Sequence, residues 1–171
     1  AGKIGVNGKG LPGGVLASPH GSGPGGGRGK LNTGAGGGHG GVGGKSVAGA
    51  LGGVTYGSAS EPTLPGSGGG MGTWTNMKGG EGGGAVFIDA RGQVSVVGAI
   101  TANGGDGFGG AAGGGSGGSV YIHCGTFSGT GSIKANGNPA VFAPQGTGNG
   151  GGGRIAVVFT NLAAQAALSP T

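Results

Sequence analysis

Glycine occupies 56 of the 171 positions, and much of it comes in uninterrupted runs such as 113–115 and 150–153. A glycine held in regular structure loses more conformational freedom than other residues, so a fold built on these runs needs a compensating interaction. Close approach between backbones, with hydrogen bonds that side chains would block, supplies one. The runs therefore predict a fold that depends on backbone contacts, with glycine segments packed side by side as polyglycine-type strands.

Two other glycine-rich classes fit the chain poorly. Collagen requires glycine at every third position and abundant proline, whereas glycine is clustered here and there are only 8 prolines. Intrinsic disorder is opposed by the hydrophobic residues, which make up 33% of the chain. They gather into short β-type runs at 86–88, 94–97, 119–122 and 155–159, a pattern typical of strands.

The strand-like runs belong to a repeat. The sequence Ile-Thr-Ala-Asn-Gly at 100–104 returns 33 residues later as Ile-Lys-Ala-Asn-Gly at 133–137, and a weaker copy stands at 4–8. In the same way, 84–88 is matched 34 residues later by 118–122. Near-constant spacing of short strands indicates coils that stack in parallel. We therefore predict an all-β fold, a glycine-rich parallel β-solenoid of the β-helix type with no substantial helix.

The repeat also predicts which residues turn the chain and which face its interior. Asn103-Gly104 and Asn136-Gly137 are predicted coil-corner turns, because asparagine and glycine tolerate left-handed backbone conformations. Strand alternation predicts a thin core. The expected inward positions are Val86, Ile88, Ile100, Val120, Ile122, Ile133, Ile155 and Val157.

The length predicts one domain over 1–171. Its expected parts are a glycine-rich N-terminal part (1–44), an irregular excursion or cap (45–80), the solenoid repeats (81–160) and a C-terminal tail (161–171).

The aromatic residues of the irregular parts are the candidate contact residues. Loops on a rigid scaffold often carry binding, so Tyr56, Trp74 and Phe142 are predicted to contact a partner protein or a glycan. For the excursion as a whole, packing as a cap over the open end or a flank of the coils is the favoured interpretation, and a recognition loop is the alternative.

An ordered series of glycine-rich blocks resembles a known class. The blocks lie at 34–41, 56–58, 65–70, 113–122 and 150–157. The series resembles glycine-rich β-solenoid segments of large secreted or cell-surface proteins of bacteria, algae and plants. This resemblance implies an extracellular location and a structural or adhesive role, with no catalytic residues to transfer. The chain departs from the pattern at Asn138-Pro139, where a glycine pair is usual.

Charge and apolar runs exclude several partners. The formal net charge is +5, but no cluster of basic residues supplies the footprint of a nucleic-acid-binding protein. No apolar run approaches the length of a membrane-spanning helix. The single cysteine, Cys124, cannot form an internal disulfide and is expected to be a small buried residue.

No motif predicts an enzyme, a cofactor or a metal site. Gly-Gly-Lys-Ser at 43–46 looks like a phosphate-binding loop, but His39 stands where that motif requires glycine. Asp106 follows an Asn-Gly-Gly stretch, yet four acidic residues cannot build a series of calcium cages. The three histidines lack cysteines at zinc spacing.

Three functions remain from different classes. The first is a self-assembling structural subunit or module of an extracellular filament, appendage or coat, associating with itself or with other surface proteins. The second is an adhesin module that binds acidic or neutral glycans, including the type found at phage tail tips. The third, and the weakest because no regular threonine ladder is present, is an ice-binding protein.

Overall fold

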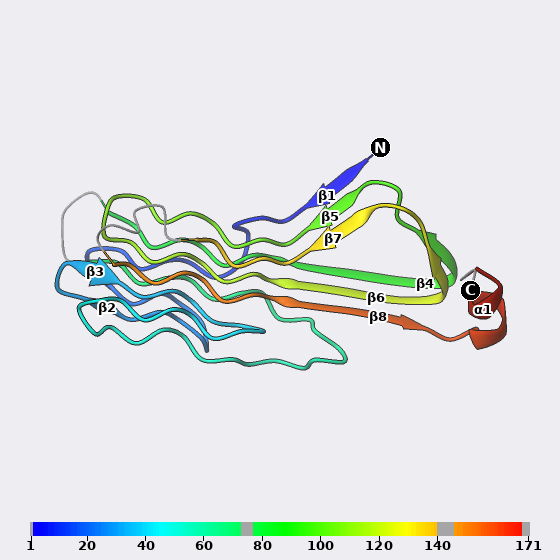
Figure 1. Cartoon of the computed structure of the whole chain (residues 1–171), viewed down its shortest axis with the longest axis horizontal. Coiled ribbons are helices and arrows are strands. Elements are labelled where there is room, and N and C mark those ends of the chain that lie inside the picture. Colours follow the sequence, from blue (N-terminus) through cyan, green and yellow to red (C-terminus); the bar gives the residue numbers. More distant parts are fainter. Residues whose placement is uncertain (1, 73–76, 140–145, 169–171) are drawn as a thin grey trace.

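A computed structural model describes residues 2–72, 77–139 and 146–168 and shows an elongated molecule with two different halves. Figure 1 places the long strands and the helix in one half, and a bundle of extended segments with one pair of two-residue strands in the other. The chain passes between the halves repeatedly, so most strands continue directly into an extended glycine segment.

Two parallel three-stranded sheets form the strand half. The first contains β4 (Ala85–Ser95), β6 (Ser119–Ser128) and β8 (Arg154–Phe159), in the order β4-β6-β8. The second contains β1 (Lys3–Gly5), β5 (Ala99–Thr101) and β7 (Ser132–Lys134), in the order β1-β5-β7. The other elements are an antiparallel pair, β2 (Gly29–Lys30) and β3 (Thr33–Gly34), and the seven-residue helix α1 (Leu162–Leu168).

The predicted all-β class is confirmed, and the strand register follows the sequence repeat. Val86 lies beside Val120, which lies beside Ile155. In the second sheet, Ile100 lies between Ile4 and Ile133, so the weak N-terminal copy of the repeat is aligned with the two strong ones. The sheets are small, however, and they do not close into a complete solenoid.

The core lies between the two sheets and is thin. Most residues predicted to face inward do so: four are buried (Val86, Ile100, Val120 and Ile122), and three are partly buried against them (Ile88, Ile133 and Val157). Ile155 is the exception at 45% exposure, although its register places it in the same row as Val120. The second sheet ends at β7, so it has no described strand at the level of β8 to cover Ile155.

The glycine half is held by hydrogen bonds whose partners repeat every three residues. Along segment 113–118, successive N–H groups donate in turn to segments 67–70, 148–151 and 102–105, and the order then repeats. A three-residue period is that of the polyproline II helix, which leaves its own backbone groups free to bond outward. The N–H groups of this one segment therefore bond three neighbouring segments at once, and its carbonyls accept hydrogen bonds from Gly37, from Gly80 and Gly83, and from Asn138.

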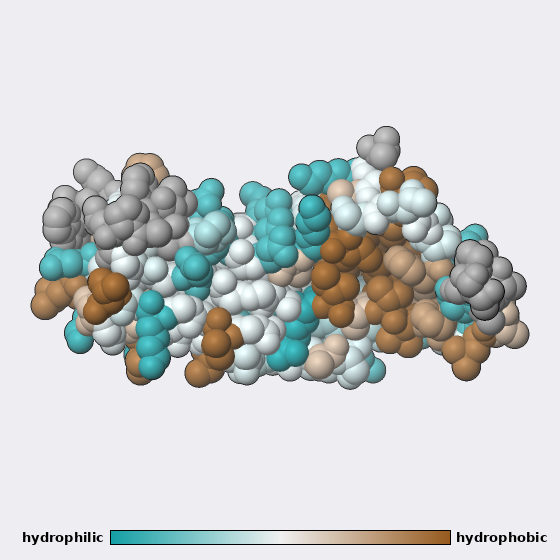
Figure 2. All heavy atoms as spheres, in the orientation of Figure 1, coloured by the Kyte–Doolittle hydropathy of each residue, from teal (hydrophilic) through white to brown (hydrophobic). Residues whose placement is uncertain are grey.

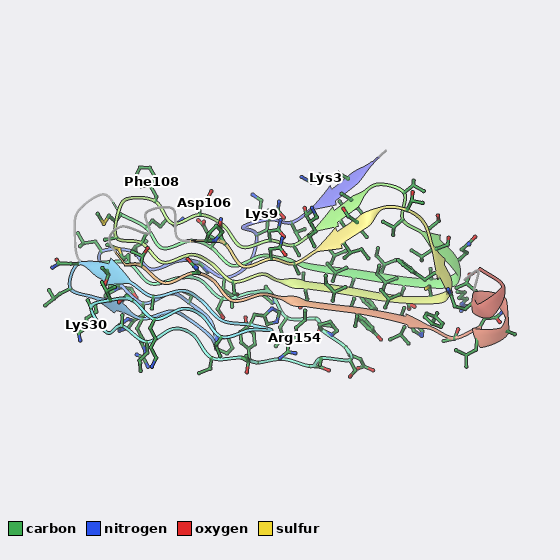
Figure 3. All side chains as sticks on the ribbon, in the orientation of Figure 1. Lys3, Lys9, Lys30, Asp106, Phe108 and Arg154 are labelled. Atoms are coloured by element: carbon green, nitrogen blue, oxygen red, sulfur yellow. The ribbon has the colours of Figure 1, made fainter. Side chains whose placement is uncertain are left out.

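Side chains have no room at most positions of this bundle. A Cβ atom on Gly115 would lie 1.8 Å from the carbonyl oxygen of Glu81, and one on Gly117 would lie 2.1 Å from that of Ala135. Figure 3 shows the consequence, since side chains are dense around the strands and sparse between the glycine segments. Backbone contact thus replaces a hydrophobic core in this half of the molecule.

This packing predicts that one glycine run contains both essential and replaceable positions. Gly117→Ala would force a methyl group against the Ala135 carbonyl and should lower the free energy of unfolding by about 1–3 kcal/mol or more. Gly152→Ala is the matched control, because a Cβ there meets no atom within 4 Å. Urea unfolding of both variants would measure the difference. Equal midpoints for the two would contradict this description of the packing.

Candidate functional site

The two ends of the strand stack differ, and one of them is open. At the open end, β4 is the outermost strand of its sheet and β1 the outermost strand of the other, with no described strand on their outer sides. An unpaired edge presents a row of free N–H and C=O groups, which is a template for another strand. The open end is therefore the first candidate for association.

An apolar cleft of about 390 Å³ lies between these two edges. Its lining includes Ile4, Ile88, Val94, Val96 and Ile100. Ile4 is 48% exposed, whereas its neighbour in the same row, Ile100, is 3% exposed. Figure 2 shows hydrophobic residues gathered on the surface of the strand half, below the strands of the second sheet. Core-type side chains are thus left uncovered at the open end.

The helix covers part of the opposite end. Helix α1 follows β8 and is capped by Asn161, whose side-chain oxygen accepts a hydrogen bond from the N–H of Ala164 at 3.0 Å. The side chain of Gln165 then accepts a hydrogen bond from the N–H of Phe127 at 2.7 Å and donates one to its carbonyl at 3.0 Å. Gln165 therefore bonds the last part of β6 as a neighbouring strand would.

A second contact lies at the other end of β8. The guanidinium Nε of Arg154 donates a hydrogen bond to the carbonyl of Tyr56 at 2.9 Å, which places the excursion beside the start of the strand. The outer side of β8 also has no described strand. Its two ends, however, are flanked by α1 after its last residue and by Tyr56 beside its first, whereas β4 has no such described contacts at its edge.

The predicted coil-corner turns at Asn103-Gly104 and Asn136-Gly137 are not found. Neither pair contains a left-handed residue or a turn, and both are extended links from a strand into a glycine segment. Among the three copies of the repeat, only Gly8 has a left-handed backbone, with φ of 59°. The chain has no need to turn there, because it continues straight into the glycine half.

The asparagines form a ladder instead. The side-chain oxygen of Asn7 accepts a hydrogen bond from the N–H of Asn103, and that of Asn103 accepts one from the N–H of Asn136, each at 2.9 Å. The ladder lines a polar cleft of about 460 Å³ together with Asp106 and Asn138. Every bond of the ladder joins adjacent repeats, so these side chains hold the repeats together.

Of the three predicted contact residues, Trp74 and Phe142 lie outside the described residues. Tyr56 is half-buried, and its hydroxyl donates a hydrogen bond to the carbonyl of Pro65 and accepts one from the hydroxyl of Ser67 at 2.9 Å. Burial raises the pKa of Tyr56. With its hydroxyl engaged on both sides, Tyr56 has the contacts of a packing residue.

His39 lies behind Tyr56 and is fully buried within the glycine half. Its ring centroid is 4.6 Å from that of Tyr56, and its Nδ1 donates a hydrogen bond to the carbonyl of Gly117 at 3.0 Å. Nε2 has no hydrogen-bond partner among the described residues. Burial, reinforced by the charge of Arg154, lowers the pKa of His39 below its ordinary value of 6.5. The imidazole is therefore neutral in the folded protein.

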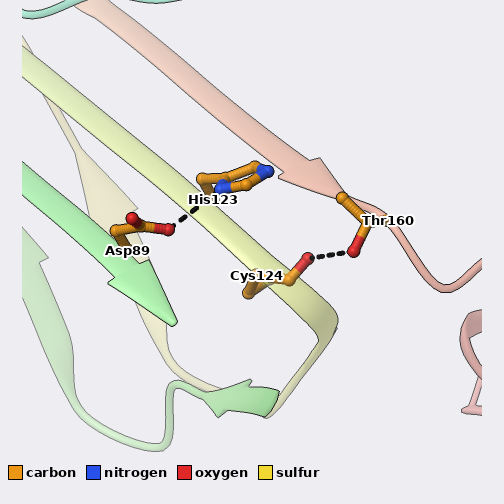
Figure 4. A network of polar contacts seen from close by, with 4 residues as sticks. All are labelled: Asp89, His123, Cys124 and Thr160. Atoms are coloured by element: carbon orange, nitrogen blue, oxygen red, sulfur yellow. Dashed lines mark hydrogen bonds and ion pairs between the residues drawn. The ribbon is translucent and has the colours of Figure 1, made fainter. Parts of the chain in front are cut away.

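The outer face of the first sheet carries an exposed group that the sequence analysis did not select. Phe87 and Tyr121 are paired across β4 and β6 and stack with ring centroids 5.3 Å apart. Two residues further along the same strands, His123 Nδ1 bonds Asp89 Oδ1 at 2.9 Å (Figure 4). In the sequence these positions are 34 residues apart, which is the offset of the repeat, so the repeat register alone predicts that they are paired.

Cys124 follows His123 but faces the other side of the sheet. It is 1% exposed within the core cluster, as predicted, and burial raises the pKa of its thiol. Its carbonyl accepts a hydrogen bond from the Thr160 hydroxyl at 3.4 Å, also drawn in Figure 4. Cys124 therefore packs as a small apolar residue.

The described part of the chain contains no group of three or more histidine, cysteine, aspartate or glutamate side chains placed to hold a metal ion. None of its helices has the length and apolar character needed to cross a membrane. No family model, curated protein or solved structure matches this chain.

The buried, neutral His39 predicts loss of stability in mild acid. The unfolded chain takes up a proton on this imidazole below pH 6.5, while the folded chain resists protonation because Nε2 is buried without an acceptor. The contribution of neutral His39 to the free energy of unfolding should therefore be complete above pH 6.5 and should be lost progressively as the pH drops below 6.5.

Chemical unfolding at a series of pH values would measure this loss, and the slope should be smaller in a His39→Gln variant. A His20→Gln variant is the control for removal of one imidazole. In the unaltered chain, an NMR titration that shows the His39 ring protonating at or above pH 6.5 would contradict the prediction.

Proposed function

We propose that this chain is a self-associating structural module of an extracellular filament, appendage or coat. The observation that supports the proposal is the asymmetry of its two ends. One end leaves β1, β4 and an apolar cleft uncovered, whereas helix α1 and the Tyr56 carbonyl contact the strands at the other. Such a module adds to a neighbour at one end and terminates the stack at the other.

The proposal includes the architecture that the repeat predicts. We regard the four successive levels as coils of a short open β-solenoid; they are β1, then β4 with β5, then β6 with β7, and then β8. Parallel pairing at offsets of 33–35 residues joins the last three levels and supports this view. The first level, β1, also pairs in parallel with β5. In such an architecture, an incomplete coil at an end is completed by a strand from a neighbour.

Ile4 is the residue best placed to drive association. It belongs to the inward row of the second sheet, yet it is about half exposed because no described segment covers it beside β4. A strand added at the β4 edge would bury it. Full burial of an exposed isoleucine contributes about 1.5–3 kcal/mol, so burial of the exposed half of Ile4 contributes about 1 kcal/mol, and the backbone bonds of a new strand pair would add to this.

The extracellular location is also part of the proposal. It follows from the resemblance to glycine-rich segments of secreted and surface proteins. A backbone-packed frame with no disulfide and a buried thiol fits a load-bearing role, because its cohesion comes from hydrogen bonds distributed over many segments.

The test is the molar mass of the purified chain over a wide range of concentration, measured by sedimentation velocity. We expect association that grows with concentration. Ile4→Asp should weaken it at least about tenfold, since a charge in the cleft removes more than the 1.4 kcal/mol that corresponds to a tenfold change.

Val47→Asp is the matched control, because Val47 is 79% exposed and lies outside the cleft. Thermal unfolding of Ile4→Asp would establish that the variant is folded. A chain that stays monomeric at every concentration would contradict the proposed function.

A further inference from the structure

We infer that the outer face of the β4-β6-β8 sheet binds a neutral glycan, with a sugar ring stacked on a ring face that the Phe87–Tyr121 pair leaves free. The outer face lies on the other side of β4 from the apolar cleft, so this inference does not depend on self-association, although β4 contributes to both surfaces. The inference is supported by the exposure of the aromatic pair, by the polar groups beside it and by the shape of the surface around it.

The aromatic pair lies on the outer face and leaves ring surface open to solvent. Phe87 is 60% exposed, and Tyr121 is half-buried. The two ring planes differ by 23° and the rings stack on each other, so each ring keeps only its other face free. Cross-strand aromatic pairs also stabilise sheets, by about 0.2–1 kcal/mol. Stabilisation of the sheet by the pair does not require the Phe87 ring to be exposed to solvent, whereas stacking of a sugar on that ring does.

Polar groups stand at the distance of one sugar residue. Asp89 and His123 are the next outward residues along β4 and β6, about 7 Å from the aromatic rung by the strand repeat. Their side chains are 63% and 41% exposed, respectively. Asp89 uses one carboxylate oxygen for His123, so the other can accept hydrogen bonds from sugar hydroxyls.

The surface around the aromatic pair is open toward β8 and is bounded by another segment before Tyr121. Beside Tyr121 on β8 lies Ala156, whose small side chain leaves the ring accessible. Before Tyr121 on β6, Ser119 is buried, and its hydroxyl donates a hydrogen bond to the carbonyl of Leu64 at 2.6 Å. The chain at Leu64 therefore lies over the sheet at that point and ends the flat surface.

This combination fits a pyranose better than a peptide or a lipid surface. One face of a pyranose ring presents C–H groups, which carry partial positive charge and stack on the negative face of an aromatic ring. Its hydroxyls need hydrogen-bond partners at the rim, which Asp89 and His123 supply. The carboxylate of Asp89 favours neutral sugars over acidic ones, and no basic cluster is present to hold an anionic membrane.

The experiment uses a printed array of neutral oligosaccharides with the full chain, followed by calorimetric titration with the strongest array binder. We expect at least one neutral oligosaccharide to bind. Phe87→Ala and Tyr121→Ala should each weaken that binding at least about tenfold, and Asp89→Asn should weaken it less.

The matched control is Phe108→Ala, because Phe108 is 70% exposed but lies in the glycine half, away from the platform (Figure 3). It should leave binding unchanged. Phe87→Leu is the second variant, since it keeps an apolar side chain in the strand and removes only the ring. Circular dichroism would verify that each variant is folded.

Two outcomes would overturn the inference. The first is that the unaltered chain binds no neutral oligosaccharide, and the second is that the Phe87→Leu variant binds as well as the unaltered chain. If the first outcome is found and Phe87→Leu also loses self-association, this face would be assigned to a second copy of the chain. Self-association that fails while glycan binding persists would contradict the proposed function and leave this inference standing.

Discussion

The structure depends on backbone segments approaching so closely that a Cβ atom cannot stand between them. Along 113–118, the N–H groups bond three neighbouring segments in rotation, and added Cβ atoms would lie about 2 Å from carbonyl groups. This constraint explains the clustered glycine, the scarcity of side chains in half the molecule and the thin core of the other half. Glycine here is selected for the contact it permits, more than for the conformations it can adopt.

The exceptions to glycine within the bundle show the same constraint. Ser67, Ser116 and His39 are fully buried in glycine segments, and each has a side-chain hydrogen bond to the backbone of another segment. A side chain is accommodated there when it supplies a bond that the backbone would otherwise make. His39 pairs Nδ1 with a carbonyl but leaves Nε2 without a described partner, which makes this position sensitive to acid.

The strand half could be predicted from the sequence because its side chains carry a pattern. Offsets of 33–35 residues give the register of the sheets, and alternation gives most of the inward residues. The glycine half could not be predicted in the same detail, because a run without side chains does not specify its neighbour. The Asn-Gly pairs predict turns, because this dipeptide often turns, but the chain continues from each strand into the glycine half and the asparagines form a ladder.

The candidate sites show a similar division. The place of Tyr56 in an irregular loop predicts a contact residue, yet its described hydrogen bonds are internal. Phe87 and Tyr121 lie in regular strands, and only their register reveals that they form one exposed pair. An open apolar end and an exposed aromatic face are both consequences of a fold whose stability does not depend on burying large side chains everywhere.

Amide hydrogen exchange, read residue by residue, tests the central claim most directly. If backbone bonding forms the frame, the amides of 113–118 should exchange as slowly as those of Val120 and Ile122 in the hydrophobic core, although almost no side chains surround them. Fast exchange throughout the glycine segments, with protection confined to β4, β6 and β8, would contradict the account.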